Sequence, residues 1–557
     1  MQGPFVRSGK TLLSGIDPVG RAGRTADAIA VKDRTLYFCP SPLYGYGLDR
    51  FLERLAAEAP ASAVLCVEAE PELFELACNS IAPSAAQNEN LRITNICEEA
   101  TLCAFVRENW GAMAFRRLET IRLTGGWQLF PQLYDSLCEA LRREIAADWS
   151  NAMTLAKLGR LYIRNALVNL SLMPFFPSIE KLSFGSSPVL VLGAGPSLDE
   201  TLDALDLRFG ESLRSPESRP FRIICADTCL GALKDRNIVP DLAVILESQH
   251  WNLRDFTGCR DWNVKAAVDF SALPASARTL GGEGYLFMTP WTHLRIFDRL
   301  KNAGLLPAVI PPLGSVGLTA VEIARRICQG KIILSGLDFS FSLDKYHARG
   351  TPGHRAKLNA HTRFRGLFNI SAYAASFAAV SKYGNSVLTS RVMQNYRDLF
   401  EREFSQDPRL FDISGTGLPL GVKTLSVEEA LEMISPGGAE NTEGRGKKEE
   451  EKEEMEKRTL LTEKVLAFYN GEISRLKELR DILTGDAAAD HARLGVLVDE
   501  CDYLWAHFPD CSGGRRPVLE ENSSGTVSFL KRVRAEIDPM LRLMGRGIFP
   551  RTTDTNK

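Results

Sequence analysis

The sequence predicts a three-part α/β protein with an N-terminal α/β domain, a second α/β domain in the centre and a helical C-terminal domain. Short apolar runs alternate with helical patterns in the first two parts, which is typical of parallel sheets. A highly charged segment then precedes long helical repeats. Because 557 residues exceed one ordinary core, we expect domains at 1–150, 185–435 and 459–557, a helical connection at 151–184 and a charged linker at 436–458.

Composition excludes several classes of function. Hydrophobic residues make up 45% of the chain, and 67 basic against 69 acidic residues give a formal net charge of -2. No overall field therefore attracts nucleic acid or an anionic membrane. The 12 cysteines are scattered, without the paired spacing of a zinc site or a disulfide framework, and predict reduced thiols. No apolar run has the length of a membrane span and the start carries no hydrophobic leader, so we expect a cytoplasmic protein.

The N-terminal domain has a Rossmann-like layout. Residues 35–39 form a predicted strand, the glycine turn 45–47 follows, and residues 48–58 form an amphipathic helix. A second predicted strand, 63–67, ends at Glu68. This acid lies near the expected ~20 residues after the glycines, where a nucleotide-binding half places a ribose-binding carboxylate. The same layout also serves as plain scaffold, which is the interpretation we favour here.

The central domain begins with a candidate phosphate loop. An apolar run, 188–192, stops at Gly193 and Gly195, and Pro196 and Ser197 then open a helical pattern. Glycine accepts positive φ and lets a ligand approach the backbone, while free N–H groups at a helix start favour an anion. The spacing lacks the third glycine of the full dinucleotide fingerprint, so a structural turn without a ligand is the alternative.

Acidic residues end the apolar runs that follow. Asp227, with Thr228 beside it, ends the second run of this domain, Glu247 ends the third, and Asp338 ends a later one. Open α/β sheets bind ligands at the carboxyl ends of their strands, so we expect these side chains at a ligand site. Asp227 is the acid placed to bind a ribose or a base.

A second glycine-containing turn precedes a predicted helix that ends near Gln329. Its residues Gly314 and Ser315 lie just before the helical pattern begins. Ser315 is placed either as the N-cap of this helix or as a hydroxyl that contacts a ligand. The N-cap interpretation is favoured because serine is a preferred capping residue.

The segment after Asp338 is rich in histidine and basic residues. Three of the seven histidines of the chain lie there beside several cations: His347, His354, His361, Arg349, Arg355, Lys357, Arg363 and Arg365. A mobile basic loop over the ligand edge of a sheet is suited to closing on a phosphate-bearing donor, and Arg349 is the cation expected to contact it. A solvated loop without a function is the alternative.

The charged segment 447–454 predicts a solvated linker or the exposed start of a helix. Beyond it, residues 459–483, 487–508 and 527–544 show helical apolar repeats. They carry no recognisable chemistry. We expect these helices to dock a partner protein or to form an oligomer.

These stretches together resemble the motility-associated factor (Maf) glycosyltransferases, in the 6-hydroxymethylpterin diphosphokinase MptE-like family. The resemblance covers about residues 10–400. Its order and spacing are more specific than any one motif. The matching stretches are Ser14-Gly15-Ile16-Asp17-Pro18, Val191-Leu192-Gly193-Ala194-Gly195-Pro196-Ser197-Leu198, Ala226-Asp227-Thr228 with Pro240-Asp241, Gly314-Ser315-Val316, and Ser335-Gly336-Leu337-Asp338 followed by His347-Ala348.

The resemblance implies a central Rossmann domain similar to bacterial sialyltransferases, whose glycine loop binds the nucleotide of a CMP-activated sugar. There the run Ser-Gly-Ile-Asp-Phe precedes a lid with a catalytic histidine, and residues 335–339 repeat it with one conservative change. Maf proteins are implied to move a nonulosonic acid, of the pseudaminic, legionaminic or sialic type, onto Ser or Thr hydroxyls of flagellin before export. The chain departs from the family at Leu337, usually Gln, and at Glu247, more often Asp, and both positions bear on the donor.

Three functions compete. In a glycosyltransferase, a general base deprotonates the acceptor hydroxyl while N–H groups, Ser315 and loop cations hold the CMP phosphate of the donor. In an ATP- and Mg²⁺-dependent diphosphokinase acting on a small alcohol such as 6-hydroxymethyl-dihydropterin, Asp227 and Glu247 would hold Mg²⁺. A non-catalytic flagellar assembly factor is the third. The large flanking domains favour the first, because a small pterin needs no large docking surface. We expect a CMP-activated nonulosonic acid as the donor and assign no cofactor, with Mg²⁺ left open.

His347 is the expected general base, ahead of His354 and His361. Its unperturbed pKa of ~6.5 leaves a neutral, proton-accepting form at cytoplasmic pH. The sialyltransferase resemblance supports a lid histidine and leaves the three candidates open, and Asp338 is the second expected catalytic residue. The residues expected to bind the donor are Gly193, Gly195, Pro196, Ser197, Asp227, Thr228, Glu247, Gly314, Ser315 and Arg349.

Overall fold

The computed structural model divides into two compact units. It describes residues 6–7, 9–111, 114–342, 345–364, 366, 376–413, 415–435, 447–485, 491–511, 516–520 and 523–545. One unit comprises Met1–Leu158 with Ala506–Pro517, and the other comprises Gly159–Trp505 with Val518–Lys557. Each unit has its own parallel sheet and its own core, so the predicted α/β fold class is confirmed.

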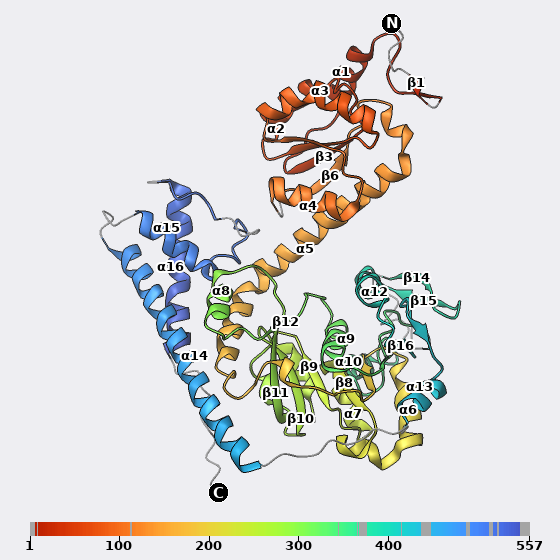
Figure 1. Ribbon diagram of the computed structural model, residues 1–557, viewed down its shortest axis with the longest axis vertical. Coiled ribbons are helices and arrows are strands. Elements are labelled where there is room, and N and C mark those ends of the chain that lie inside the picture. Colours follow the sequence, from red (N-terminus) through yellow and green to blue (C-terminus); the bar gives the residue numbers. More distant parts are fainter. Residues whose placement is uncertain are drawn as a thin grey trace. The chain divides into compact units, whose positions relative to one another are not determined.

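The N-terminal unit is built on a parallel sheet that has four strands within the described residues (Figure 1). Its order is β5-β4-β3-β6, from β3 (Thr35–Pro40), β4 (Ala63–Val67), β5 (Leu91–Thr94) and β6 (Arg117–Thr120). Every residue of β3 and β4 is buried, as expected for strands covered on both faces. The helices of this unit are α1 (Pro18–Ala28), α2 (Leu48–Glu58), α3 (Pro71–Gln87) and α4 (Glu99–Trp110), and a short hairpin joins β1 (Val6–Arg7) to β2 (Lys10–Thr11).

A nine-stranded parallel sheet, counted over the described residues, forms the centre of the second unit. Its order is β12-β11-β10-β9-β8-β7-β13-β16-β17. The strands are β7 (Val189–Leu192), β8 (Arg222–Ala226), β9 (Leu242–Ile245), β10 (Val264–Asp269), β11 (Gly281–Met288), β12 (Ala308–Val309), β13 (Ile332–Ser335), β16 (Leu410–Asp412) and β17 (Lys423–Thr424). The chain builds outward from β7 as far as β12 and then returns to the other side of β7 with β13. This reversal defines a doubly wound sheet.

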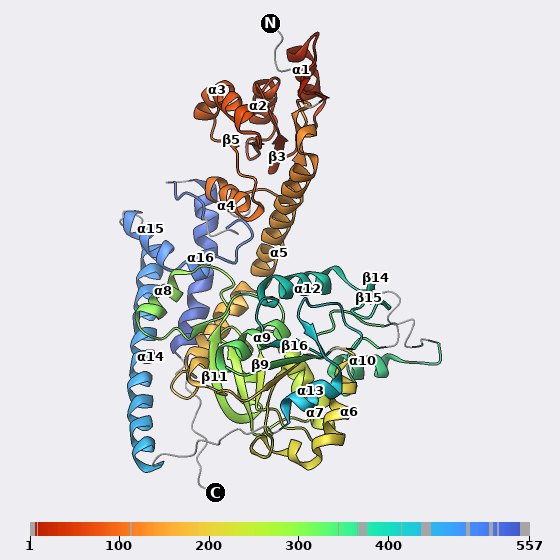
Figure 2. The same ribbon diagram turned by 45° about the vertical axis from the view of Figure 1, so that its right-hand side comes forward.

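Helices cover both faces of the central sheet. The helix α9 (Val316–Ile327) shares a core cluster with Val189, Val191 and Ile224, together with side chains of α12 (Arg391–Phe404). The helices α6 (Leu198–Phe209) and α7 (Leu230–Asp235) lie on the opposite face (Figures 1 and 2). Further elements of this unit are α8 (Arg295–Asn302), α10 (Pro352–Ala360), α13 (Val427–Ile434) and the hairpin of β14 (Phe377–Val380) and β15 (Ser386–Thr389).

A single helix, α5 (Pro131–Leu170), includes much of the segment that the sequence predicted as a separate connection. Its last turns are fastened to the central sheet by two fully buried asparagines. Asn165 Nδ2 donates to the carbonyl oxygens of Ser248 at 3.0 Å and Ser271 at 3.1 Å, and Asn169 Nδ2 donates to two carbonyls of the loop after β10. These bonds position the loops after β9 and β10, which are adjacent strands.

The C-terminal helices belong to the same compact unit as the central sheet, and the predicted division into three domains stays a prediction. They are α14 (Lys447–Thr484), α15 (His491–Glu500) and α16 (Ser524–Gly545), and the charged segment 447–454 is the start of α14. Glu472 of α14 is 1% exposed and accepts hydrogen bonds from Arg299 of α8 at 2.7 and 2.9 Å. A buried carboxylate that loses its partner is costly, so this pair joins the helices to the sheet.

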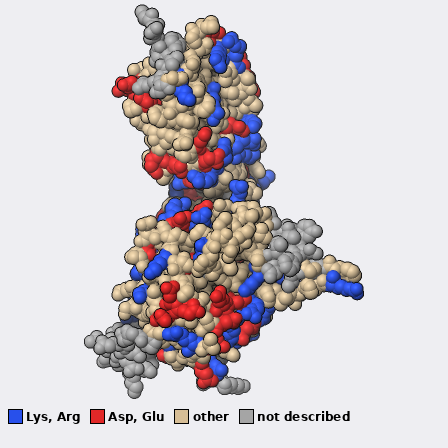
Figure 3. Space-filling model, turned by 90° about the vertical axis from the view of Figure 1, so that its right-hand side faces the viewer, with Lys and Arg blue, Asp and Glu red and all other residues tan. Residues whose placement is uncertain are grey.

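The distribution of charged side chains on the surface agrees with the small net charge of the chain. Figure 3 shows acidic and basic side chains interspersed on the face that it presents. Nine of the 12 cysteines are buried, and their reduced state stays a prediction. Within the described ranges, none of the helices combines the length and the apolar character needed to cross a membrane.

Candidate functional site

The candidate site lies where β7 and β13 run side by side. The four residues of β7 pair with the four residues of β13 in parallel register, from Val189 with Ile332 to Leu192 with Ser335. Because the winding direction of the sheet reverses between these two strands, their carboxyl ends form a topological switch point, where open α/β sheets bind ligands. The predicted glycine loop follows β7, and Asp338 follows β13.

The glycines of the loop after β7 allow it to pack tightly against the loop after β13. A Cβ on Gly195 would lie 2.6 Å from Gly336 O, and a Cβ on Gly193 would lie 2.5 Å from the same oxygen. Gly193 N donates to Ser335 O and Gly195 N donates to Gly336 O, each at 2.8 Å. The glycines are therefore required by close backbone contact, and these two N–H groups are already engaged. Their predicted contact with a phosphate stays a prediction.

Asp338 is buried against the start of α6. Its carboxylate accepts a hydrogen bond from Ser197 N at 2.8 Å and another from Ser197 Oγ at 2.6 Å. The residue is 1% exposed, and burial raises the pKa of its carboxyl. This geometry supports a role in positioning the glycine loop, which Pro196 joins to Ser197. The catalytic role expected for Asp338 stays a prediction.

The start of α9 lies close to the same loops. Leu337 Cδ2 would be 2.6 Å from a Cβ on Gly193 and also 2.6 Å from a Cβ on Gly317, so this leucine packs between the glycine loop and the first turn of α9. Ser315 is the N-cap residue of α9, as the sequence predicted, but its side chain makes no capping hydrogen bond. Gly314, exposed and at φ +69°, packs against Tyr396. The Ser315 hydroxyl is thus available at the edge of the sheet.

The histidine-bearing loop is fastened over the switch point. Ala348 N donates to Ala194 O of the glycine loop at 3.0 Å. Asp199, 3% exposed in the first turn of α6, accepts hydrogen bonds from Arg349 N at 3.1 Å and contacts Lys345 Nζ at 2.9 Å. Burial acts to raise the pKa of Asp199, but its bonds to Lys345 and Arg349 outweigh burial and lower it.

Arg349 faces acids of α6 in this conformation. Its guanidinium lies 3.4 Å from Asp199 and 3.1 Å from Asp203. A phosphate would have to replace or share these partners. Arg365, also counted among the cations of this loop, lies outside the described residues.

His347 directly precedes Ala348, whose N–H donates to Ala194 O of the glycine loop. Burial lowers its pKa to about 4, with further lowering by Lys357, Arg254 and His354. Its imidazole is therefore neutral at neutral pH. Burial also lowers the pKa of His354, which lies within α10, and His361 is exposed at the end of that helix. The choice of His347 among the three candidates stays a prediction.

A buried acid pair is formed by Asp227 at the end of β8 and Asp255 in the turn after β9. Asn252 Nδ2 donates to Asp227 Oδ2 at 2.7 Å and to Asp255 Oδ2 at 3.3 Å, and Asn252 Oδ1 accepts from Ser276 Oγ at 2.9 Å. Burial, followed by the charge of Asp255, raises the pKa of Asp227 to about 7, and burial raises that of Asp255 to about 6. Thr228 N also donates to Asp227 at 2.8 Å. Perturbed carboxyls of this kind are common at functional sites.

Glu247 is exposed and accepts a hydrogen bond from Gln249 N at 2.9 Å. Its charge contributes to raising the pKa of both Asp227 and Asp255, so the three carboxylates are near one another. Nevertheless, the structure does not arrange three or more histidine, cysteine, aspartate or glutamate residues for a metal ion anywhere in the described ranges. The Mg²⁺ considered for Asp227 and Glu247 stays a prediction.

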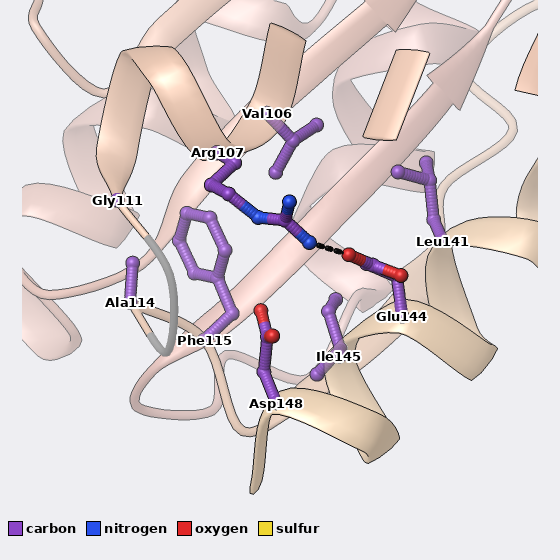
Figure 4. A pocket seen from close by; sticks show the side chains of 9 residues that line it. All are labelled: Val106, Arg107, Gly111, Ala114, Phe115, Leu141, Glu144, Ile145 and Asp148. Atoms are coloured by element: carbon purple, nitrogen blue, oxygen red, sulfur yellow. Dashed lines mark ion pairs between the residues drawn. The ribbon is translucent and has the colours of Figure 1, made fainter. Parts of the chain in front are cut away.

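Two cavities lie in the N-terminal unit, and none of the residues described above lines them. The first, ≈ 20 Å³, is walled by α4 and α5 and is spanned by the ion pair of Arg107 and Glu144 (Figure 4). The second, ≈ 450 Å³, is lined by α1 and the start of α2, including Arg24 and Arg50. Neither contains a residue that the sequence predicted for the donor.

Several residues of the site were not predicted. The strand β10 ends on the buried Asp269, and its run 264–268 followed by an acid has the same pattern as the neighbouring strands. An apolar run that ends on an acid could therefore have identified Asp269 from the sequence. Asn252, Asp255 and Asp199 carry no such signal, because a single polar residue in a loop or a first helical turn reveals its partners only after folding.

The central region matches a known family. Residues 162–344 match the family model described as 6-hydroxymethylpterin diphosphokinase MptE-like. This range includes the glycine loop, the buried acid pair and Asp338. Residues 162–344 are therefore similar to the MptE-like family, and the predicted resemblance to the Maf and MptE-like family is confirmed.

Individual relatives extend the match to nearly the whole chain. An uncharacterized protein of Treponema pallidum (strain Nichols) is 28% identical over 545 residues, which cover 94% of this chain and 90% of that protein. The solved structure of a Maf glycosyltransferase from Magnetospirillum magneticum AMB-1 is similar with a TM-score of 0.51 and 14% identity, covering 96% of this chain and 83% of that one. The chain therefore shares the fold of that protein.

Proposed function

We propose that this protein is a glycosyltransferase that moves a nonulosonic acid from a CMP-activated donor to Ser or Thr hydroxyls of flagellin in the cytoplasm, in support of flagellar assembly and motility. The observation that carries the proposal is the meeting of three segments at the β7–β13 switch point: the glycine loop, the N-terminus of α9 and the basic loop that carries His347. The fold shared with a Maf glycosyltransferase supports it.

In the proposed reaction His347 accepts the proton of the acceptor hydroxyl. The acceptor oxygen then bonds to the anomeric carbon of the sugar, while the bond from that carbon to the phosphate oxygen of CMP breaks and CMP leaves with the electron pair. A pKa of about 4 keeps His347 neutral but makes it a weak base. An anionic donor beside Lys357 and Arg254 would offset the cations that lower this pKa, so donor binding would strengthen the base.

The leaving phosphate needs donors that remain available. The Ser315 hydroxyl makes no capping bond, and the N-terminus of α9 carries partial positive charge. Loop cations would add charge once the donor draws them from Asp199 and Asp203. The C-terminal helices would serve the acceptor protein or an oligomer interface.

The diphosphokinase named by the family model is the second candidate, and the cluster of Asp227, Asp255 and Glu247 favours it. In that reaction the acids would bind Mg²⁺ and ATP. Calorimetric titration of the protein with CMP, and with ATP in the presence and absence of Mg²⁺, distinguishes the two. We expect binding of CMP without Mg²⁺, and release of CMP when a CMP-activated nonulosonic acid and flagellin are supplied together. Binding of ATP alone, strengthened by Mg²⁺, would replace the proposal with the kinase.

A further inference from the structure

The turn after β9 presents an exposed aromatic ring beside a cation. The 3₁₀ helix His250–Phe256 follows the third strand of the central domain. Trp251 is 62% exposed, an unusual state for the largest apolar side chain, and its ring lies 4.2 Å from the ring of His250. The Arg254 side chain, on the same turn, is 66% exposed.

The periodicity of this turn separates a buried row from an exposed row. In a 3₁₀ helix, side chains three residues apart lie on the same side. Asn252 and Asp255 form the row that is buried and bonded to Asp227. Trp251 and Arg254 form the exposed row. Because the buried row is held by a carboxylate at the end of β8, the exposed row is presented in a fixed orientation rather than on a loose loop.

Arg254 lies on the side of the turn near the histidine loop. Its charge contributes to lowering the pKa of His347, which places it within electrostatic range of that loop. Its Nε is 3.7 Å from Asp255 Oδ1, too long for a hydrogen bond. The guanidinium therefore retains donors for an anion, while the indole beside it offers an open aromatic face.

We propose that Trp251 and Arg254 form the nucleotide-recognition surface of this protein, with the indole stacking on the base and the guanidinium binding a phosphate oxygen. The inference rests on the proposed function. In a doubly wound sheet a nucleotide whose phosphates face the first strand extends its ribose and base toward the second and third strands, which here are β8 and β9. Stacking recognises any base through its π-face, and the guanidinium matches phosphate geometry.

The contacts proposed for the two side chains can be tested separately by comparing the binding of cytidine and CMP. Trp251→Ala should weaken the binding of both ligands ~10-fold or more, because both contain the base. Trp251→Phe should keep both affinities within about threefold, since a ring remains. Arg254→Gln should weaken CMP ~10-fold while leaving cytidine unchanged, because only CMP carries the phosphate. Leu207→Ala is the matched control, an apolar residue of α6 that is 92% exposed.

Titration calorimetry on the full chain measures these affinities, and thermal unfolding confirms that each variant is folded. Equal CMP affinity in the wild type and Trp251→Ala would overturn the stacking surface while leaving the proposed function intact. Equal loss of cytidine and CMP in Arg254→Gln would overturn the phosphate contact. A wild-type protein that binds neither CMP nor ATP would overturn the proposed function and this inference together.

Discussion

The two sheets of this protein have the same arrangement around their first strand. In the N-terminal unit β3 lies between β4 and β6, and in the central unit β7 lies between β8 and β13. A loop with glycines follows the first strand in both, and an acid follows the second, Glu68 in one and Asp227 in the other. Burial raises the pKa of both acids. The arrangement around the first strand and the local sequence therefore do not distinguish the two sheets.

The contacts of the two acids do distinguish them. Glu68 is fully buried and accepts hydrogen bonds from Ser41 Oγ at 2.7 Å and the Tyr134 hydroxyl at 3.3 Å, so it joins β3, β4 and α5. Asp227 instead orients the turn that carries Trp251 and Arg254. The candidate site of the central sheet therefore depends on loops that other parts of the chain bring to the sheet edge, here the histidine loop.

The largest expected effect comes from filling the glycine of the central loop. Gly195→Ala should abolish measurable CMP binding, a loss of ~100-fold or more, because its Cβ would lie 2.6 Å from Gly336 O and push the two loops apart. Gly45→Ala makes the matched change in the N-terminal sheet, where the Cβ would meet the Ile81 side chain. Calorimetry should show unchanged CMP affinity in Gly45→Ala.

The two glycine variants also test whether each glycine-containing loop is plain scaffold or binds a nucleotide. Gly45→Ala should lower the thermal stability of the N-terminal unit, because this glycine has φ +69°. A Gly195→Ala protein that binds CMP as tightly as the wild type would show that the β7 loop is plain scaffold too. Loss of CMP binding in Gly45→Ala would assign a nucleotide to the N-terminal sheet.

The sequence predicts the strands of the two sheets more accurately than it predicts the contacts that loops and distant helices make. Predicted strands such as 63–67 match the observed bounds of β4, because a short apolar run between turn residues has few alternatives. The sequence did not predict the buried pair of Glu472 and Arg299, because these residues are far apart in the chain. The exposed Trp251 was missed for a related reason, since exposure is a property of the folded surface.

The second prediction distinguishes His347 from His361 by the effect of each on catalysis. His347→Ala should lower kcat for sugar transfer ~100-fold or more while CMP affinity stays within about threefold, because a general base acts on the acceptor proton and not on the bound nucleotide. His361→Ala is the control, since this exposed residue ends α10. Steady-state kinetics with flagellin as acceptor measures both. Near wild-type turnover in His347→Ala would remove this residue from the mechanism, and a parallel loss of CMP affinity would make it a binding residue.

The smallest expected effect on CMP binding accompanies a change in the pH dependence of stability. An unfolded aspartate titrates near pH ~4, whereas folded Asp227 titrates near a pKa of about 7. Between these values the folded state holds a proton that the unfolded state has lost, so the free energy of unfolding falls as pH rises through this window, by at most ~1.4 kcal/mol per pH unit. Below the window both states are protonated and the full stabilisation is present.

Asp227→Asn removes this proton and should flatten the slope for the central unit, and Glu68→Gln should flatten the slope for the N-terminal unit because its pKa is raised in the same direction. Scanning calorimetry of the full chain at several pH values measures both slopes. The two variants should differ in binding: Asp227→Asn should weaken CMP a few-fold by disturbing the bond to Asn252, and Glu68→Gln should leave it unchanged. Identical CMP affinities in the two variants would mean that Asp227, like Glu68, only supports the fold.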